Sequence, residues 1–109
     1  MPYASEYVLT QLINRASEGN AASIAAPGAG SRIAIDYLVV HPSGGANIIT
    51  LNGSISVPFS LNDNETLQLE NSIHTPLGIF PCDDNQAFTV VQNLATQVEG
   101  YVLYRIVGK

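Results

Sequence analysis

The segment Gly100–Val107 constrains the fold of this chain more than any other stretch of its sequence. Its eight positions hold two tyrosines and four aliphatic residues, with Arg105 as the only charge. β-branched and aromatic side chains of this kind suit a pleated, half-buried surface. We therefore predict a strand here, and we expect it to pair with the other strongly apolar run, Arg32–Val40.

The rest of the chain after residue 20 alternates between short apolar runs and turn residues. Asn52-Gly53 is the strongest hairpin signal, and Pro58 predicts an edge strand because proline cannot donate to a ladder. The runs give about eight strands, which predicts a single all-β, antiparallel sandwich or jelly-roll domain over residues 21–109. The expected strands are 21–26, 32–40, 46–51, 54–59, 65–70, 75–80, 87–92 and 100–107.

Residues 1–20 are ambiguous, because their apolar positions fit two periods. A helix would place Val8, Leu12 and Ile13 on one face. A strand would align Tyr7, Leu9, Gln11 and Ile13 on one side. We predict an N-terminal arm over residues 1–20 that the fold does not need but attachment does. The alternative is an ordinary first strand of the sandwich.

Strict alternation through Arg32–Val40 separates two faces of the strand. One face is apolar throughout and consists of Ile33, Ile35, Tyr37 and Val39. The other face is apolar enough at Leu38 and Val40 to be covered as well.

Asp36 and Arg105 are each a lone charge within a strongly apolar strand. Burying an unpaired charge is costly. We therefore predict that the two side chains lie within reach of each other on neighbouring strands.

The sequence supplies few charged residues for the surface of the protein. Hydrophobic residues make up 46% of the chain and charged residues 12%, against about 25% charged residues in typical domains. We expect other subunits to cover part of the surface; the alternative is a monomer solvated by Ser, Thr, Asn and Gln. The residues we expect at an interface with another subunit or with a capsid are Tyr7, Leu9, Leu12, Ile13, Leu38, Val40, Tyr101 and Leu103.

Several classes of partner are excluded by composition. The net charge is −5 and the four basic residues are scattered, which argues against nucleic acid and anionic membranes. Cys82 is the only cysteine, so an internal disulfide and a multi-thiol metal site are impossible. The first twenty residues lack the apolar core of a signal peptide, and no apolar run approaches the roughly twenty residues of a membrane span. We expect synthesis in the cytosol.

Candidate chemistry is sparse. His41, His74 and Cys82 match no metal-ligand spacing, and both histidines flank turns. Asp83-Asp84-Asn85 offers hard oxygens for calcium, but it lacks the other ligands and the glycine of a dedicated loop. We therefore expect no catalytic residue, metal or cofactor, and a protein that is not an enzyme.

Five tyrosines offer an alternative function, because aromatic rings stack on sugars and some jelly rolls are lectins. The competing interpretation places Tyr37, Tyr101 and Tyr104 in the core or at a subunit interface, where tyrosine is common. The absence of tryptophan weakens the carbohydrate-binding alternative.

The order of several segments carries a resemblance to a known family. After a short small-residue strand, Ala29–Ile33 opens a strand that carries Tyr37, and a short hairpin follows. Thr75–Phe80 then precedes a polar loop and Gln86-Ala87-Phe88, and Val98–Tyr104 closes the chain. This layout, over Ala21–Val107, resembles small structural proteins of tailed bacteriophages that decorate or cement the head. The chain departs from their pattern in having no tryptophan and in placing Cys82-Asp83-Asp84 in the late loop.

The resemblance implies a single β-sandwich or jelly-roll domain, often assembled as a homotrimer. It implies that the partner is the major capsid protein, that the protein resides on the outer surface of the virion, and that it stabilises the shell by bridging capsid subunits. It implies no catalytic residues.

Overall fold

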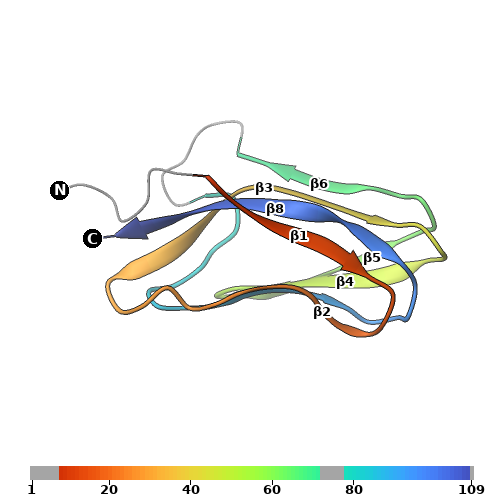
Figure 1. Ribbon diagram of the computed structural model, residues 1–109, viewed down its shortest axis with the longest axis horizontal. Coiled ribbons are helices and arrows are strands. Elements are labelled where there is room, and N and C mark those ends of the chain that lie inside the picture. The colour runs from red at the N-terminus through yellow and green to blue at the C-terminus, as the bar shows by residue number, and fades with distance from the viewer. Residues whose placement is uncertain (1–7, 72–77, 109) are drawn as a thin grey trace.

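The computed structural model of the chain describes residues 8–71 and 78–108. These residues form two four-stranded β-sheets packed face to face, with no helix among them (Figure 1). The all-β sandwich predicted from the sequence is confirmed. The strands are β1 (Leu9–Arg15), β2 (Gly19–Ile24), β3 (Ser31–Pro42), β4 (Asn47–Asn52), β5 (Ser56–Leu61), β6 (Leu67–Glu70), β7 (Phe88–Gln92) and β8 (Val98–Gly108).

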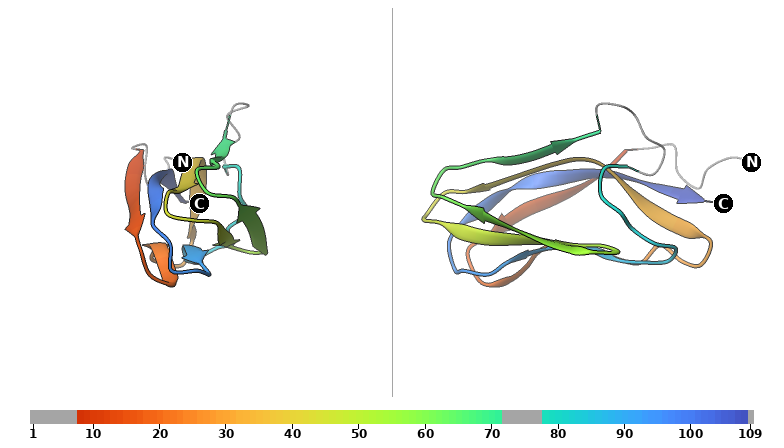
Figure 2. Two further views of the ribbon diagram at one scale, coloured as in Figure 1. Left: turned by 90° about the vertical axis from the view of Figure 1, so that its right-hand side faces the viewer. Right: turned by 180° about the vertical axis from the view of Figure 1, so that it is seen from behind.

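The strand order is that of a jelly roll. One sheet runs β1-β8-β3-β6 and the other β2-β7-β4-β5, and the paired strands are antiparallel. The pairs β1/β8, β2/β7, β3/β6 and β4/β5 follow one another along a single antiparallel two-stranded ribbon. The closed end of this ribbon is the turn at residues 53–55. Rolling this ribbon up adds the pairs β3/β8 and β4/β7 and produces the two layers seen in Figure 2.

Three predicted features of the strands are confirmed. The closing strand β8 pairs with β3 from Ser31↔Gly108 to Pro42↔Val98, and β5 with its Pro58 lies at a sheet edge. A hairpin turn follows Asn52, although its loop has three residues, 53–55. Gly53 is required there for space, because a Cβ atom would collide with the carbonyl oxygen of Pro81.

The core lies between the two sheets and is filled by side chains from all the long strands. The rings of Phe80 and Phe88 meet edge to face, with centroids 5.4 Å apart. Gly100 lets β8 approach β3 closely, since a Cβ atom there would collide with the carbonyl oxygen of Val39. The largest fully buried apolar side chains are Phe88, Ile33, Ile35, Leu38, Ile49, Leu51, Val40, Val90, Val98 and Val102.

A β-bulge in β3 overturns the predicted assignment of its two faces. The register with β8 shifts between Ile35 and Tyr37, which makes Asp36 an extra residue. An extra residue moves every later side chain to the opposite face, because side chains alternate with a period of two. Leu38 and Val40 are therefore fully buried on the same face as Ile35. The prediction that Tyr37 shares a face with Ile35 is wrong.

Asp36 and Arg105 form the predicted ion pair across β3 and β8. Arg105 Nε donates to Asp36 Oδ2 at 2.6 Å and Nη2 donates to Oδ1 at 2.9 Å, and both side chains are largely buried. Asn71 also holds the bulge: its backbone N–H donates to the Asp36 carbonyl, and its Nδ2 donates to Asp36 Oδ1. The prediction is confirmed, and the bidentate geometry is the strong form of this interaction.

The predicted N-terminal arm of residues 1–20 is wrong for most of its length. β1 pairs with β8 from Leu9↔Tyr104 to Arg15↔Val98, and β2 begins at Gly19, before the predicted domain start at Ala21. Ile13 is buried in the core. The alternative of an ordinary first strand holds for residues 9–15, and residues 1–7 lie outside the described part of the chain.

The predicted strand 75–80 is only partly described. Gly78 forms an isolated parallel bridge with Ile35, and Ile79 donates its N–H to the Ile35 carbonyl. Residues 75–77 lie outside the described residues.

We predict that Asp36→Ala lowers the free energy of unfolding by about 2–3 kcal/mol, because it leaves Arg105 without its carboxylate in a largely buried place. Urea denaturation measures the change. Glu99→Ala, an exposed charge on the same strand as Arg105, is the control and should change stability by less than about 0.5 kcal/mol. Equal stability of the two variants would contradict the structural role of the ion pair.

We predict that a chain beginning at Ala21 loses cooperative thermal unfolding, because the deletion removes β1 with Ile13 and leaves one side of β8 unpaired. Circular dichroism during heating measures this. A chain beginning at Val8 keeps all eight strands and is the control. A sharp melting transition of the shorter chain would restore the arm interpretation.

Candidate functional site

The outer face of the β1-β8-β3-β6 sheet presents a regular set of apolar side chains. Two cross-strand rows form it. One row runs Leu12–Tyr101–Val39, and the next runs Thr10–Leu103–Tyr37. We call these six residues the outer face. They point away from the core because the intervening row, which contains Val102 and Leu38, points into it.

The outer face is accessible. The side chain of Leu12 is 69% exposed and that of Tyr101 is 36% exposed, while Val39, Leu103 and Tyr37 are half-buried by their neighbours. Soluble domains rarely expose a contiguous row of large apolar side chains without a use for it.

Tyr37 and Tyr101 form an aromatic pair at the centre of the outer face. Their ring centroids lie 5.7 Å apart and their planes are inclined by 31°. Burial raises the pKa of Tyr37, and the neighbouring Tyr101 and Glu70 raise it further. A side-chain hydrogen bond to Tyr101 also raises the pKa of Tyr37, so the two tyrosines are joined by their hydroxyls as well as by their rings.

Charged groups border the outer face without entering it. Glu70 lies opposite Tyr37 on β6, and the Asp36–Arg105 ion pair follows the bulge on the same side. On the side of the two rows away from this ion pair, His41 lies opposite Glu99. Protein–protein interfaces also commonly have an apolar centre and a polar rim.

The structure places the predicted interface residues in three different environments. Leu12, Tyr101 and Leu103 lie on the outer face, and Leu9 is exposed on β1. For Ile13, Leu38 and Val40 the prediction is wrong, since all three are core residues. Tyr7 lies outside the described residues.

The sequence analysis left Tyr37 open between the core and a subunit interface, and it did not name Val39 as an interface residue. The bulge at Asp36, which was not anticipated, places both on the outer face. A signal was present, since an aspartate within an apolar strand is disfavoured in a regular ladder.

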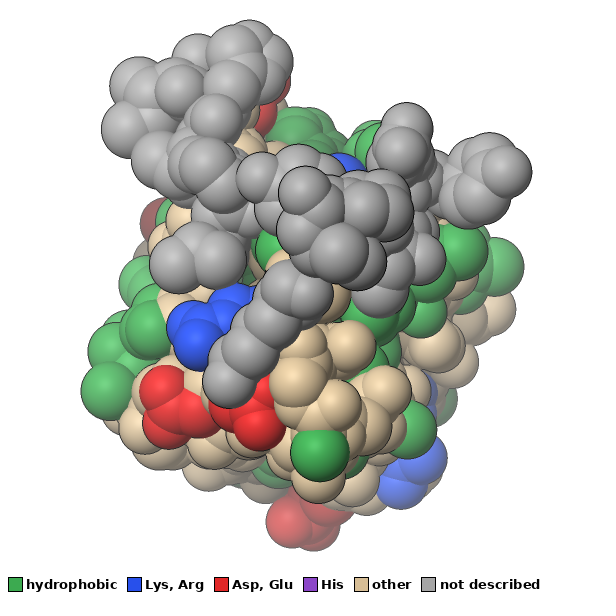
Figure 3. Space-filling view, turned by 90° about the vertical axis from the view of Figure 1, so that its left-hand side faces the viewer, with side chains coloured by type: hydrophobic (Ala, Val, Ile, Leu, Met, Phe, Trp, Pro, Cys, Tyr) green, Lys and Arg blue, Asp and Glu red, His purple; other side chains and the backbone are tan. Residues whose placement is uncertain are grey.

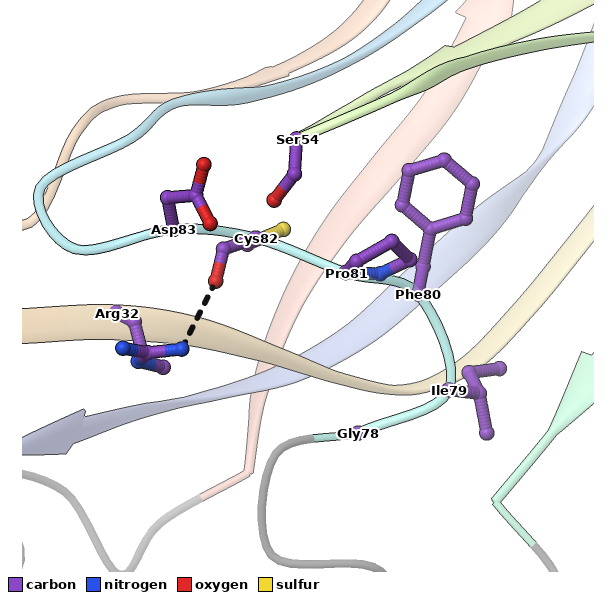
Figure 4. Close-up of a pocket in the computed structure, with 8 residues that line it drawn as sticks. All are labelled: Arg32, Ser54, Gly78, Ile79, Phe80, Pro81, Cys82 and Asp83. Carbon is purple, nitrogen blue, oxygen red and sulfur yellow. Dashed lines mark hydrogen bonds between the residues drawn. The ribbon is translucent and has the colours of Figure 1, made fainter.

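A second feature is a hollow at the end of the sandwich where β3 begins and β8 ends (Figure 4). Its volume is about 310 Å³, and its walls come from β3, the β4–β5 turn and the segment after Gly78. Arg32 points into it and donates from Nη1 to the Cys82 carbonyl at 3.5 Å. Ser54 donates its N–H to the carbonyl of Pro81, which ties the turn to this segment. In the end-on view, acidic and basic side chains lie side by side below the grey residues (Figure 3).

Cys82 in this hollow is a poor nucleophile. Burial raises the pKa of its thiol to about 11, an effect that Asp83 strengthens and Arg32 opposes. The thiolate is the reactive form of cysteine, and it is scarce at neutral pH when the pKa is this high.

Two of the other candidate ligands, His41 and Asn85, form hydrogen bonds within the fold. His41 Nδ1 lies 3.1 Å from Thr66 Oγ1. Asn85 has a left-handed backbone, and its side chain accepts a hydrogen bond from the Gly28 N–H. Across residues 8–71 and 78–108, no three histidine, cysteine or acidic side chains gather as metal ligands would. His74 falls outside these ranges.

Comparisons of the chain with protein-family models, with curated proteins and with solved structures find no match. In the part of the chain that the structure describes, no helix has the length and apolarity needed to cross a membrane. The functional argument therefore rests on the fold and on the outer face.

Proposed function

We propose that this chain is a non-enzymatic structural protein of a tailed-bacteriophage virion, which binds the outside of the head as a homo-oligomer and stabilises the shell. The observation that carries the proposal is the exposed apolar outer face with its polar rim. The jelly-roll strand order supports it, because viral capsid proteins are among the proteins that use this architecture. The low fraction of charged residues also supports it.

The outer face suits a contact that stabilises by added buried area. Its side chains stand on three hydrogen-bonded strands, so binding orders few flexible groups and costs little conformational entropy. Leu12 at its edge and Tyr101 at its centre offer exposed apolar surface, and the tyrosine hydroxyls offer hydrogen bonds. A protein that binds only the assembled shell shifts the equilibrium toward that shell by mass action. The resemblance to head-decoration proteins adds the expectation of a trimer.

Carbohydrate binding is the second candidate, and one observation favours it. The Tyr37–Tyr101 pair is a partly exposed aromatic platform. A sugar ring could stack on such a platform. Retention on a glycan array would support this alternative, whereas co-migration with virions supports the first proposal.

We predict that the chain co-sediments with purified capsids of its phage and that Tyr101→Glu weakens this binding at least about tenfold. A charge at the centre of a desolvated contact should cost more than about 1.4 kcal/mol. Circular dichroism should show unchanged folding, because Tyr101 lies outside the core. Leu94→Glu, at an exposed apolar residue outside the strands, is the matched control.

Two results would count against the proposal. The first is a wild-type chain that stays in the supernatant with capsids in excess. The second is a Tyr101→Glu variant that binds capsids as tightly as the Leu94→Glu variant does.

A further inference from the structure

The four edge strands of the sandwich differ in how they are protected against pairing with another chain. The edges are β1 and β6 in one sheet and β2 and β5 in the other. An unprotected edge presents free backbone N–H and C=O groups that can accept a further strand. Proteins usually block such edges with proline, a bulge, charges or a very short strand.

Three of these edges carry such a device. β5 contains Pro58, β6 has only four residues and ends in Glu70, and β2 has a bulge between Asn20 and Ala22. Each device interrupts or shortens the row of backbone groups that a new strand would need.

β1 carries none of these devices. Its seven residues pair with β8 in unbroken register, without proline, glycine or a bulge. Its one charge, Arg15, stands at the end of the strand and turns back to donate to the carbonyls of Ser17 and Glu18. Figure 2 shows β1 at one margin of the molecule, with β8 on its inner side.

The most exposed large apolar side chain of the described residues lies at the middle of this edge. Leu12 is 69% exposed and is the central residue of Leu9–Arg15. Leu9, at the start of the strand, is 38% exposed. Pairing at this edge would cover apolar side chains as well as backbone groups.

We propose that β1 pairs with β1 of a second copy of this chain, antiparallel and about a two-fold axis at Leu12, so that the two sheets become one continuous sheet. The strand is self-complementary in this register. Leu12 faces Leu12 of the second copy on the outer side, and Thr10 faces Asn14. On the inner side Gln11 faces Ile13, and Leu9 faces Arg15, so that no two like charges meet.

This contact goes beyond the proposed function and does not depend on it. It sets the outer faces of two copies side by side, with both Leu12 side chains at the centre of one wider apolar surface. Because a two-fold contact is isologous, it gives an even number of copies rather than the trimer that the resemblance implies.

The mass of the full chain at micromolar concentration, measured by light scattering after size exclusion, tests the contact. We expect twice the 11.6 kDa chain mass or an even multiple of it. Leu12→Lys and Leu12→Glu should each halve that mass, because like charges then face each other at the axis. An equimolar mixture of the two variants should restore it, because a lysine then faces a glutamate. Ile55→Lys, at another exposed apolar side chain, is the control and should keep the wild-type mass.

Amide hydrogen exchange separates edge pairing from contact through the outer face alone. Exchange within Leu9–Arg15 should be slower in the wild-type dimer than in Leu12→Lys. A monomeric or trimeric wild-type chain, an unchanged mass of Leu12→Lys, a mixture that stays monomeric, or equal exchange in β1 would each overturn the proposal. Capsid binding by a chain without this pairing would leave the proposed function standing, and pairing without capsid binding would leave the edge contact standing.

Discussion

The ion pair between Asp36 and Arg105 fixes the arrangement on which the rest of this structure depends. It holds an extra residue in β3 next to β8, where a regular ladder would have none. Before the bulge, the odd-numbered residues Ile33 and Ile35 face the core. After it, the even-numbered residues face the core instead. Leu38 and Val40 fill the core, and Tyr37 and Val39 become part of the surface.

The two ends of the sandwich are held in different ways. At one end, buried amides tie the loops: Asn47 Nδ2 donates to the Leu94 carbonyl and to Thr96 Oγ1, and Gln92 Nε2 donates to the carbonyls of Arg15 and Thr96. At the other end, the segment that carries Cys82 packs closely against two other strands or turns. Gly53 lies against the backbone of Pro81, and Gly78 lies against the backbone of Ile35.

The sequence was sufficient for the elements that depend on local pattern. Strong alternation and β-branched residues identified β3 and β8, their apolar match predicted their pairing, and Pro58 predicted the edge. The same lone charges that predicted the ion pair also marked the bulge, but a pattern with a fixed period of two cannot include an inserted residue. The sequence analysis therefore assigned each residue of β3 after Asp36 to the wrong face of the strand.

The first strand and the functional surface needed the tertiary structure. The period of residues 1–20 fits a helix and a strand equally, and only the pairing with β8 decides between them. Leu12 could be named from its apolar character, whereas its position beside Val39 and Tyr37 across β8 follows only from the register. The buried amides Asn47 and Gln92 gave no signal, because polar residues at strand ends are common in exposed turns as well.

The account depends on which side chains of β3 face outward, and cysteine labelling measures this directly. Val39→Cys and Leu38→Cys are each made in a Cys82→Ala background, and dilute native protein is exposed to a water-soluble thiol reagent. The account predicts that Val39→Cys reacts in the native state and that Leu38→Cys reacts only on unfolding. Rapid native labelling of Leu38→Cys together with protection of Val39→Cys would contradict the bulge, the outer face and the function built on them.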